Sequence, residues 1–109
     1  MNRGEIWTVA GGPAYAGKPR PAVIVQDDAF AARDSVTICP LTSQTTDLPL
    51  FRIPVEPSPT NGLAVTRCLM VDKLTTVPRA RLGRRIGILD DALLVRMNRS
   101  ILVFLGLAR

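Results

Sequence analysis

The sequence predicts a mainly β protein in which a small barrel of short strands is followed by one C-terminal α-helix. Short runs of β-branched and apolar residues recur from residue 4 to residue 88, separated by segments rich in Gly and Pro. After residue 90 the apolar residues change to helical spacing. The chain has 109 residues and no internal repeat or linker, so we expect a single domain that covers residues 1–109.

Three strands are expected in the first half of the chain. Their ranges are Gly4–Ala10, Pro21–Gln26 and Ser35–Thr42, and the third alternates its side chains with a period of two. The segment from Gly11 to Pro21 holds three Gly and three Pro, which predicts a long loop. Long loops in compact domains are typically functional, so this loop is a candidate ligand-binding segment. A short polar turn is expected over Asp27–Arg33.

The second half predicts further strands and a helix. Phe51–Glu56 has the composition of a strand, and its Pro54 favours an edge or a bulge because Pro donates no hydrogen bond. Asn61-Gly62 is the expected hairpin turn before the longest strand, Leu63–Lys73. Short strands follow at Thr75–Val77 and Ile86–Ile88, and Arg79–Arg85 is expected to be basic connecting chain.

The C-terminal segment predicts an amphipathic helix. Asp90 or Asp91 is the expected N-cap, and Gly106 is expected to end the helix. The apolar side chains at helical spacing are Leu94, Met97, Ile101 and Leu105. We expect this stripe to face the core or a dimer interface.

Composition restricts the cellular context. The longest apolar run is far shorter than the roughly 18 residues needed to cross a bilayer, and no apolar segment follows the N-terminal Met1–Glu5 as in a signal peptide. Cys39 and Cys68 lie in separate apolar stretches, as expected of reduced structural cysteines. We therefore expect a cytoplasmic protein that does not bind membranes.

Charge and chemistry point to an RNA substrate. The net charge is +5, and 12 of the 14 basic residues are Arg, whose planar fork binds phosphate bidentately; a genome-wide preference for Arg would give the same composition. The chain has no histidine, the commonest metal ligand and general base, and no CxxC pair. A nuclease without metal or histidine needs a substrate that carries its own nucleophile, and RNA has one in its 2′-hydroxyl. No cofactor is expected.

Four motifs resemble the MazF/PemK family of bacterial toxins. They are RGEIW at Arg3–Trp7, GKPRPAVIVQDDAF at Gly17–Phe30, VTICPLTS at Val36–Ser43 and GLAVTRCLMVDKLTTVPRARLGRRIGIL at Gly62–Leu89. The resemblance covers residues 3 to 105, and its specificity comes from the order and spacing of the motifs. It implies an SH3-like β-barrel that forms a homodimer. It also implies sequence-specific, metal-independent cleavage of single-stranded RNA to 2′,3′-cyclic phosphate and 5′-hydroxyl ends, and inhibition by a cognate acidic antitoxin of a type II module.

The same resemblance implies catalytic roles for Arg20, Thr42 and Asp72. Arg20 matches the family's Arg-Pro step and is expected to stabilise the phosphorane, although it would also be explained as a tie within its own loop. Thr42 is expected to position the phosphate or the 2′-hydroxyl; the alternative is a hydroxyl that caps the next turn. Asp72 is the candidate general base, with a structural salt bridge as the equal alternative.

The remaining groove residues are expected to bind RNA. They are Tyr15, Lys18, Ser43, Gln44 and Lys73, with Tyr15 either stacking on a base or covering its loop. The chain departs from the family pattern at Tyr15-Ala16 and at Thr75, so no relative's cleavage sequence is transferred. The alternative function is that of a CcdB-like toxin, which has the same barrel, poisons DNA gyrase and is not an enzyme.

Overall fold

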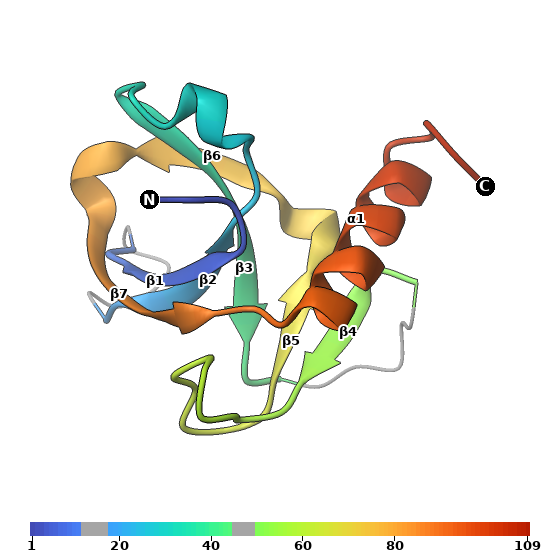
Figure 1. Cartoon of the computed structure of the whole chain (residues 1–109), viewed down its shortest axis with the longest axis horizontal. Helices are drawn as coiled ribbons and strands as arrows, with labels where there is room; N and C mark the ends of the chain where they lie inside the picture. The colour runs from blue at the N-terminus through green and yellow to red at the C-terminus, as the bar shows by residue number, and fades with distance from the viewer. Residues whose placement is uncertain (12–17, 45–49) are drawn as a thin grey trace.

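The computed structural model describes residues 1–11, 18–44 and 50–109, and within these ranges it confirms a mainly β fold with one C-terminal helix (Figure 1). The strands form one antiparallel sheet of order β4-β5-β3-β2-β1-β7, with β6 also paired to β3. The elements are β1 (Glu5–Val9), β2 (Arg20–Ile24), η2 (Asp28–Phe30), β3 (Ser35–Thr42), β4 (Arg52–Val55), β5 (Arg67–Met70), η3 (Val71–Lys73), β6 (Thr75–Pro78), η4 (Arg79–Arg81), β7 (Leu82–Ile88) and α1 (Asp91–Phe104). No helix in the described ranges is long and apolar enough to cross a membrane.

Strand β3 is the centre of the sheet because it pairs with three other strands. One edge pairs with β2, through Ile24↔Ile38 to Ala22↔Pro40. The other edge pairs with β6 over residues 35–38 and then with β5 over residues 41–42. Pro40 lies where this edge changes partner, a place where a residue without an N–H breaks no ladder bond.

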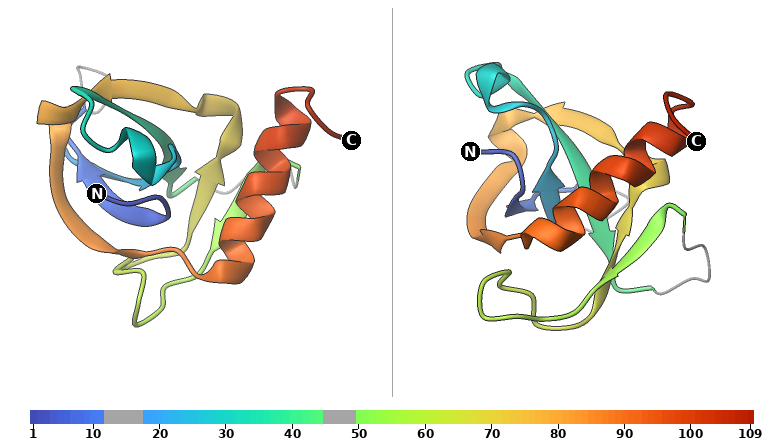
Figure 2. Two further views of the ribbon diagram at one scale, coloured as in Figure 1. Left: turned by 45° about the horizontal axis from the view of Figure 1, so that its top comes forward. Right: turned by 45° about the vertical axis from the view of Figure 1, so that its right-hand side comes forward.

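The curled sheet has a hydrophobic cluster on each face. One cluster lies between the sheet and α1, which runs along the outside of the barrel beside β4 and η3 (Figure 2). Met97 of α1 is completely buried there, and Leu94 and Ile101 pack against the same cluster. The second cluster fills the inside of the curl, and its members are Val9, Ala22, Ile24, Val36, Ile38 and Val77. Both faces are thus covered, which fits an open barrel with an external helix.

The helix begins and ends as its sequence predicts. The Asp90 carboxylate accepts a hydrogen bond from the Leu93 N–H at 2.8 Å, so Asp90 is the N-cap. After Phe104 the chain turns at Gly106, which has a φ of 78°. The Gly106 and Leu107 N–H groups donate back to the carbonyls of Val103 and Leu102, which is a Schellman motif. Of the predicted stripe, only Leu105 does not join this core, because it is the C-cap residue and is 55% exposed in the single chain.

The predicted long strand over Leu63–Lys73 is wrong. Only Arg67–Met70 is strand, and Val71–Lys73 is the 3-10 turn η3. Between the pairs Leu41↔Leu69 and Ile38↔Thr75, β3 advances three residues while the facing chain advances six. The three surplus residues must leave the ladder, and they form η3.

The residues before β5 form a loop rather than a strand because the buried Asn61 holds them. Its side chain accepts hydrogen bonds from the N–H groups of Ser58 and Leu63 and donates one to the Glu56 carbonyl. The chain therefore does turn at Asn61-Gly62 as predicted, and this turn packs against β7, where Gly62 lies next to the Ile86 backbone. The expected connecting chain at Arg79–Arg85 is also wrong, because β7 already begins at Leu82 and pairs with β1 as far as Ile88.

Gly62 provides a test of this loop packing. Its φ is 71°, and a Cβ on it would lie 2.0 Å from the Ile86 carbonyl oxygen. We expect Gly62→Ala to lower the free energy of unfolding by about 2–5 kcal/mol, since a left-handed residue and a steric clash both contribute. Gly106 has a φ of 78° but no atom within 4 Å of its would-be Cβ, so Gly106→Ala should lose only about 1–2 kcal/mol. Equal losses in urea unfolding of the two variants would show that the loop does not pack on β7.

Candidate functional site

The register between β2 and β3 brings two predicted catalytic residues together. Ala22 pairs with Pro40, and the same register continued by two residues places Arg20 opposite Thr42. Residues two apart on a strand share a face, so both side chains lie on the face of Ala22 and Pro40. Directly opposite residues have Cβ atoms about 4.5–5.5 Å apart. The continued register therefore puts the Arg20 and Thr42 side chains on the same face of the sheet, at neighbouring positions.

These residues line an open groove of about 320 Å³. Four of the lining residues were predicted as site residues: Arg20, Thr42, Ser43 and Gln44. The other three are Pro40, Leu41 and Met70, which the sequence reasoning missed. Met70 belongs here because the register between β3 and β5, continued by one residue, places it opposite Pro40. The groove thus crosses β2, β3 and β5 at their shared end.

The hydroxyl of Thr42 is held in place by the loop that follows. Its Oγ1 accepts a hydrogen bond from the Gln44 N–H at 3.1 Å, which is the turn-capping role considered as the alternative. That bond uses one lone pair of the oxygen and leaves its proton free to donate. The two roles are therefore compatible, because the cap fixes the hydroxyl that a ligand in the groove would meet.

A second, smaller cleft adjoins the groove and shares Arg20 and Pro40 with it. It lies over the end of β1 and beside β6, and its polar edge also includes Thr75 and Arg81. Arg81 is exposed and is fixed through its backbone carbonyl, which accepts a hydrogen bond from Ala10 at 2.8 Å. A polymer in the groove would therefore meet a second arginine on this side.

Three other predicted residues do not line the groove. Lys18 and Lys73 are exposed, on the approach to β2 and in η3. Tyr15 lies outside the described residues, together with most of the β1–β2 loop. The RNA-binding roles of all three stay predictions.

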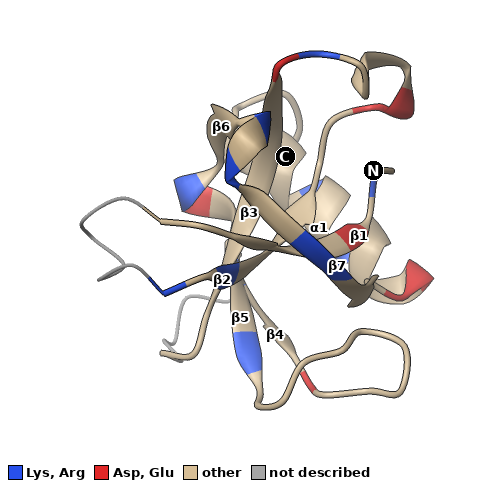
Figure 3. Cartoon of the chain, turned by 90° about the vertical axis from the view of Figure 1, so that its left-hand side faces the viewer, with Lys and Arg blue, Asp and Glu red and all other residues tan. Residues whose placement is uncertain are grey.

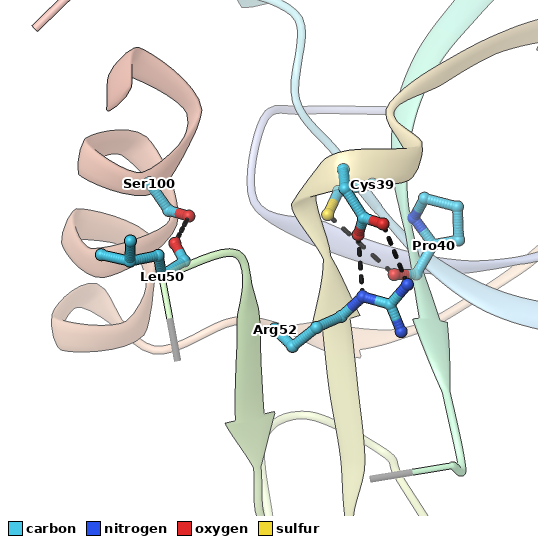
Figure 4. Close-up of polar contacts among 6 residues, drawn as sticks. Cys39, Pro40, Leu50, Arg52 and Ser100 are labelled. Carbon is cyan, nitrogen blue, oxygen red and sulfur yellow. Dashed lines mark hydrogen bonds and ion pairs between the residues drawn. The ribbon is translucent and has the colours of Figure 1, made fainter. Parts of the chain in front are cut away.

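Asp72 is held in an ion pair with Arg52. The Nε and Nη2 atoms of Arg52 donate to the two carboxylate oxygens at 2.7 and 3.0 Å (Figure 4). The hydrogen bond from Arg52 holds the pKa of the Asp72 carboxyl below its ordinary value, against the opposing effect of burial. Both partners are largely covered, with side chains 12% and 22% exposed. This arrangement matches the salt bridge that was the alternative to a general base.

Two further polar contacts are drawn with this ion pair in Figure 4. The thiol of Cys39 donates to the Pro40 carbonyl at 4.0 Å. Cys39 is buried, and burial raises the pKa of its thiol to about 12, so it stays protonated at neutral pH. The Ser100 hydroxyl of α1 donates to the Leu50 carbonyl and so ties the helix to the chain entering β4 (Figure 4). Both contacts are structural.

Every charged residue on β2, β5 and β7 is an arginine (blue in Figure 3). Within the described residues the ion pairs are Arg52–Asp72 and Arg85–Glu5, at 2.7 and 3.1 Å. Neither involves Arg20, nor Arg67 at the start of β5, another residue that the sequence reasoning missed. Nothing in the spacing of Arg67 distinguishes it from surface arginines; only the burial of its guanidinium does.

The ion pair predicts a pH-dependent stability. We expect Asp72→Asn to lower the free energy of unfolding by about 1.5–3 kcal/mol at pH 7, because a charged hydrogen-bonded pair is broken. Because the folded pKa of Asp72 is depressed, this contribution is complete at neutral pH and is lost as the pH falls below about 4. Urea unfolding of both proteins between pH 7 and pH 2 measures this difference. As a control, Arg85→Gln breaks a pair whose Arg is 50% exposed, and it should cost at most about 1 kcal/mol. A difference that persists unchanged at pH 2 would contradict the pairing.

Comparison with known proteins agrees with this site. The family model described as the PemK-like, MazF-like toxin of type II toxin–antitoxin systems matches residues 2–105. The chain is 53% identical over 108 residues to the probable endoribonuclease MazF of Mycolicibacterium smegmatis, covering 99% of both chains. It is 31% identical over 116 residues to endoribonuclease MazF9 of Mycobacterium tuberculosis, covering 98% of both.

A solved structure shows the same fold. The M. tuberculosis toxin MazF-mt6 matches with a TM-score of 0.81 and 24% identity, over 96% of this chain and 99% of that chain. At this identity the likeness concerns the fold alone, and it confirms the predicted MazF-like barrel. The family model and the 53% identical relative together cover almost every residue. This chain belongs to the PemK/MazF family of toxins of type II toxin–antitoxin systems.

Proposed function

We propose that this protein is an endoribonuclease that cleaves single-stranded RNA in the groove of Arg20 and Thr42 without a metal ion. The observation that carries the proposal is that Arg20 and Thr42 line one groove, in which the Gln44 N–H fixes the Thr42 hydroxyl. The MazF endoribonucleases of M. smegmatis and M. tuberculosis support it, because they match along nearly the whole chain.

The chemistry follows from the substrate. The 2′-hydroxyl attacks the neighbouring phosphorus, forming the 2′-O–P bond while the P–O5′ bond breaks. The proton of the 2′-hydroxyl leaves as it attacks, and the departing O5′ gains a proton. The products are a 2′,3′-cyclic phosphate and a 5′-hydroxyl. RNA supplies the nucleophile, so the protein needs to position the phosphate and stabilise its developing charge.

Arg20 and Thr42 divide these two tasks. Arg20 supplies a planar guanidinium with several N–H donors, so its role is to stabilise the negative charge of the pentacovalent phosphorane. Thr42, fixed by the Gln44 N–H, donates to a phosphate oxygen and holds the group in line for attack. Ser43 and Gln44 extend the lining of the groove and provide hydrogen-bonding groups for base edges.

Asp72 has a supporting role in this proposal. Its two oxygens are bound by Arg52, and its lowered pKa makes the carboxylate a weaker base. Because η3 directly follows Met70, which lines the groove, the pair positions that wall. We therefore assign Asp72 to the support of the groove rather than to proton transfer.

The protein is proposed to act in the cytoplasm as a homodimer, with the groove shared across the dimer face, and to be inhibited by an acidic antitoxin. A related mycobacterial endoribonuclease has been solved in complex with its cognate antitoxin. The net charge of +5 suits an acidic partner as well as RNA. Family membership leaves the gyrase-poisoning alternative without a supporting observation, and a gyrase poison would leave RNA intact.

Cleavage in EDTA tests the proposed reaction. We expect discrete RNA fragments with 2′,3′-cyclic phosphate ends, and Arg20→Ala and Thr42→Val each to lower the rate by about 10²–10³-fold with an unchanged melting temperature. Thr42→Ser keeps the hydroxyl and should keep most of the activity. Arg33→Gln removes an exposed charge just before β3, at the opposite end of that strand from Thr42, and should leave the rate unchanged. Fragments with 5′-phosphate ends or a strict need for Mg²⁺ would rule out this mechanism.

The role of Asp72 is tested by a matched pair of variants. If Asp72 only supports the groove, Asp72→Asn and Arg52→Gln should lower cleavage equally, by less than about tenfold, because each breaks the same contact. Initial rates at a fixed RNA concentration, measured well below both melting temperatures, provide the comparison. A loss of orders of magnitude for Asp72→Asn alone would identify Asp72 as the general base after all.

Antitoxin binding is expected to compete with RNA and to be steered by charge. Raising the salt concentration should lower the association rate more than it raises the dissociation rate, because salt screens long-range attraction over about 8 Å at physiological ionic strength. Stopped-flow binding at several salt concentrations measures both rates. An RNA whose reacting 2′-hydroxyl is replaced by hydrogen serves as the uncleavable competitor. If antitoxin and this RNA bind together without weakening each other, the shared-groove model is wrong.

A further inference from the structure

Arg67, the first residue of β5, carries a buried guanidinium nitrogen. Its Nη1 atom has less than 1 Å² of exposed surface and no hydrogen-bond partner among the described residues. Burying a charged donor without an acceptor is unfavourable, so such groups are rare and usually have a functional reason. Arg67 as a whole stays partly exposed, so the side chain remains reachable from solvent.

Arg67 lies beside the proposed catalytic groove. Its neighbour Cys68 pairs with Thr42, and the same register continued by one residue places Arg67 opposite Ser43. Thr42 and Ser43 both line the groove. Arg67 is not one of the lining residues, but this register places it next to Ser43 at the edge of the groove.

The second feature of Arg67 is its electrostatic surroundings. Burial lowers the pKa of its guanidinium, and the positive charge of Arg20 lowers it further. Arg52, on β4 and three strands away from Arg20, shows the opposite case, because its hydrogen bond with Asp72 raises its pKa. Among the described residues neither Arg20 nor Arg67 has a carboxylate partner. The positive charge of Arg20 thus acts on Arg67, and the described residues supply neither arginine with a carboxylate counter-charge.

We propose that Arg67 and Arg20 form a two-arginine site for one phosphodiester group of the RNA, with the hydroxyls of Thr42 and Ser43 as further donors. The proposal rests on the proposed function and extends it by naming a second cation for the substrate. The four side chains supply donors from three strands or strand ends and no acceptor carboxylate. A tetrahedral phosphodiester with two non-bridging oxygens fits donors from several directions better than a planar carboxylate does.

The site has a consequence for the protein without RNA. The repulsion between Arg67 and Arg20 destabilises the free protein, and a phosphate bound by both arginines removes that penalty. Arg67→Met keeps the length and apolar stem of the side chain but removes its charge. We therefore expect this variant to melt several degrees higher than the parent protein in phosphate-free buffer while binding RNA more weakly. If Arg67 only stabilised the fold, its replacement would lower the melting temperature instead.

The experiment measures binding of an oligoribonucleotide with a 2′-deoxy residue at the cleavage position, at several salt concentrations. The variants are Arg67→Met, Arg67→Lys, which keeps the charge but not the fork, and Arg33→Gln as the control for a lost charge. We expect Arg67→Met to weaken binding at least tenfold and to lower the salt slope by about 0.7, the value for one lost phosphate contact on a single strand. Arg67→Lys should be intermediate, and Arg33→Gln should match the parent. If Arg67→Met binds as tightly as Arg33→Gln with the same salt slope, the proposal is overturned.

A titration with inorganic phosphate separates this proposal from the proposed function. The side-chain NMR resonance of Arg67, assigned by its absence in Arg67→Met, should shift with phosphate in the parent protein and should shift less in Arg20→Ala. If it shifts but the protein does not cleave RNA, the anion site stands and the proposed function fails. If RNA is cleaved but phosphate leaves the resonance unmoved and Arg67→Met cleaves normally, the site fails and the function stands. A shift with polyglutamate but not with phosphate would assign Arg67 to an acidic protein partner and overturn the RNA proposal.

Discussion

The groove depends on one constraint, which is that β3 pairs with different strands along its two edges. The ladder with β2 runs to Ala22↔Pro40, and its register continued by two residues brings Arg20 opposite Thr42, while the ladder with β5 pairs Cys68 with Thr42 from the other side. The backbone pairing of β3 with β2 and β5 thus sets the position of Thr42 independently of side-chain contacts. Pro40, two residues earlier, lies where the second edge changes from β6 to β5 and contributes the apolar floor beside the hydroxyl. The position of the reactive groups therefore follows from backbone registers.

The change of partner along β3 also explains the ion pair behind the groove. The facing chain has three residues more than β3 can pair with, and these residues form η3. A turn that leaves its ladder needs other contacts, and two of them come from the chain at the edge strand β4: the Phe51 carbonyl accepts from the Val71 N–H at 2.9 Å, and Arg52 holds Asp72. A carboxylate at this place is accordingly needed for the fold, whatever the reaction requires.

The sequence predicts the parts of this structure that are set by local preferences. Alternation in Ser35–Thr42, the cap at Asp90 and the glycine at Gly106 each determine an element by short-range geometry, and each is confirmed. The predicted strand over Leu63–Lys73 is wrong because the apolar residues of this segment are compatible with a continuous strand. The bulge at η3 comes instead from the register of β3, which the local sequence pattern does not show. The same distinction holds in the site. Motif resemblance selects Arg20 and Thr42, and the groove contains both, but the pairing of Asp72 with Arg52, 20 positions away, has no local signal.

The distribution of acidic residues explains why the groove stays positive. Most carboxylates in the described residues are already used in structural contacts: Asp27 and Asp90 accept from backbone N–H groups at the starts of η2 and α1, and Asp28 accepts from the Arg3 N–H. Glu5 and Asp72 neutralise Arg85 and Arg52. The chain has 14 basic and nine acidic residues, so using the acids in this way leaves the excess of arginine uncompensated elsewhere. Part of that excess lies at Arg20, Arg67 and Arg81, which line or adjoin the groove and the neighbouring cleft, and at Arg67 burial and the charge of Arg20 both oppose the positive charge in the free protein. An anionic ligand removes that penalty as it binds. The charge distribution that lowers the stability of the free protein therefore strengthens binding of a phosphate backbone. An acidic inhibitor that reaches these arginines gains the same energy.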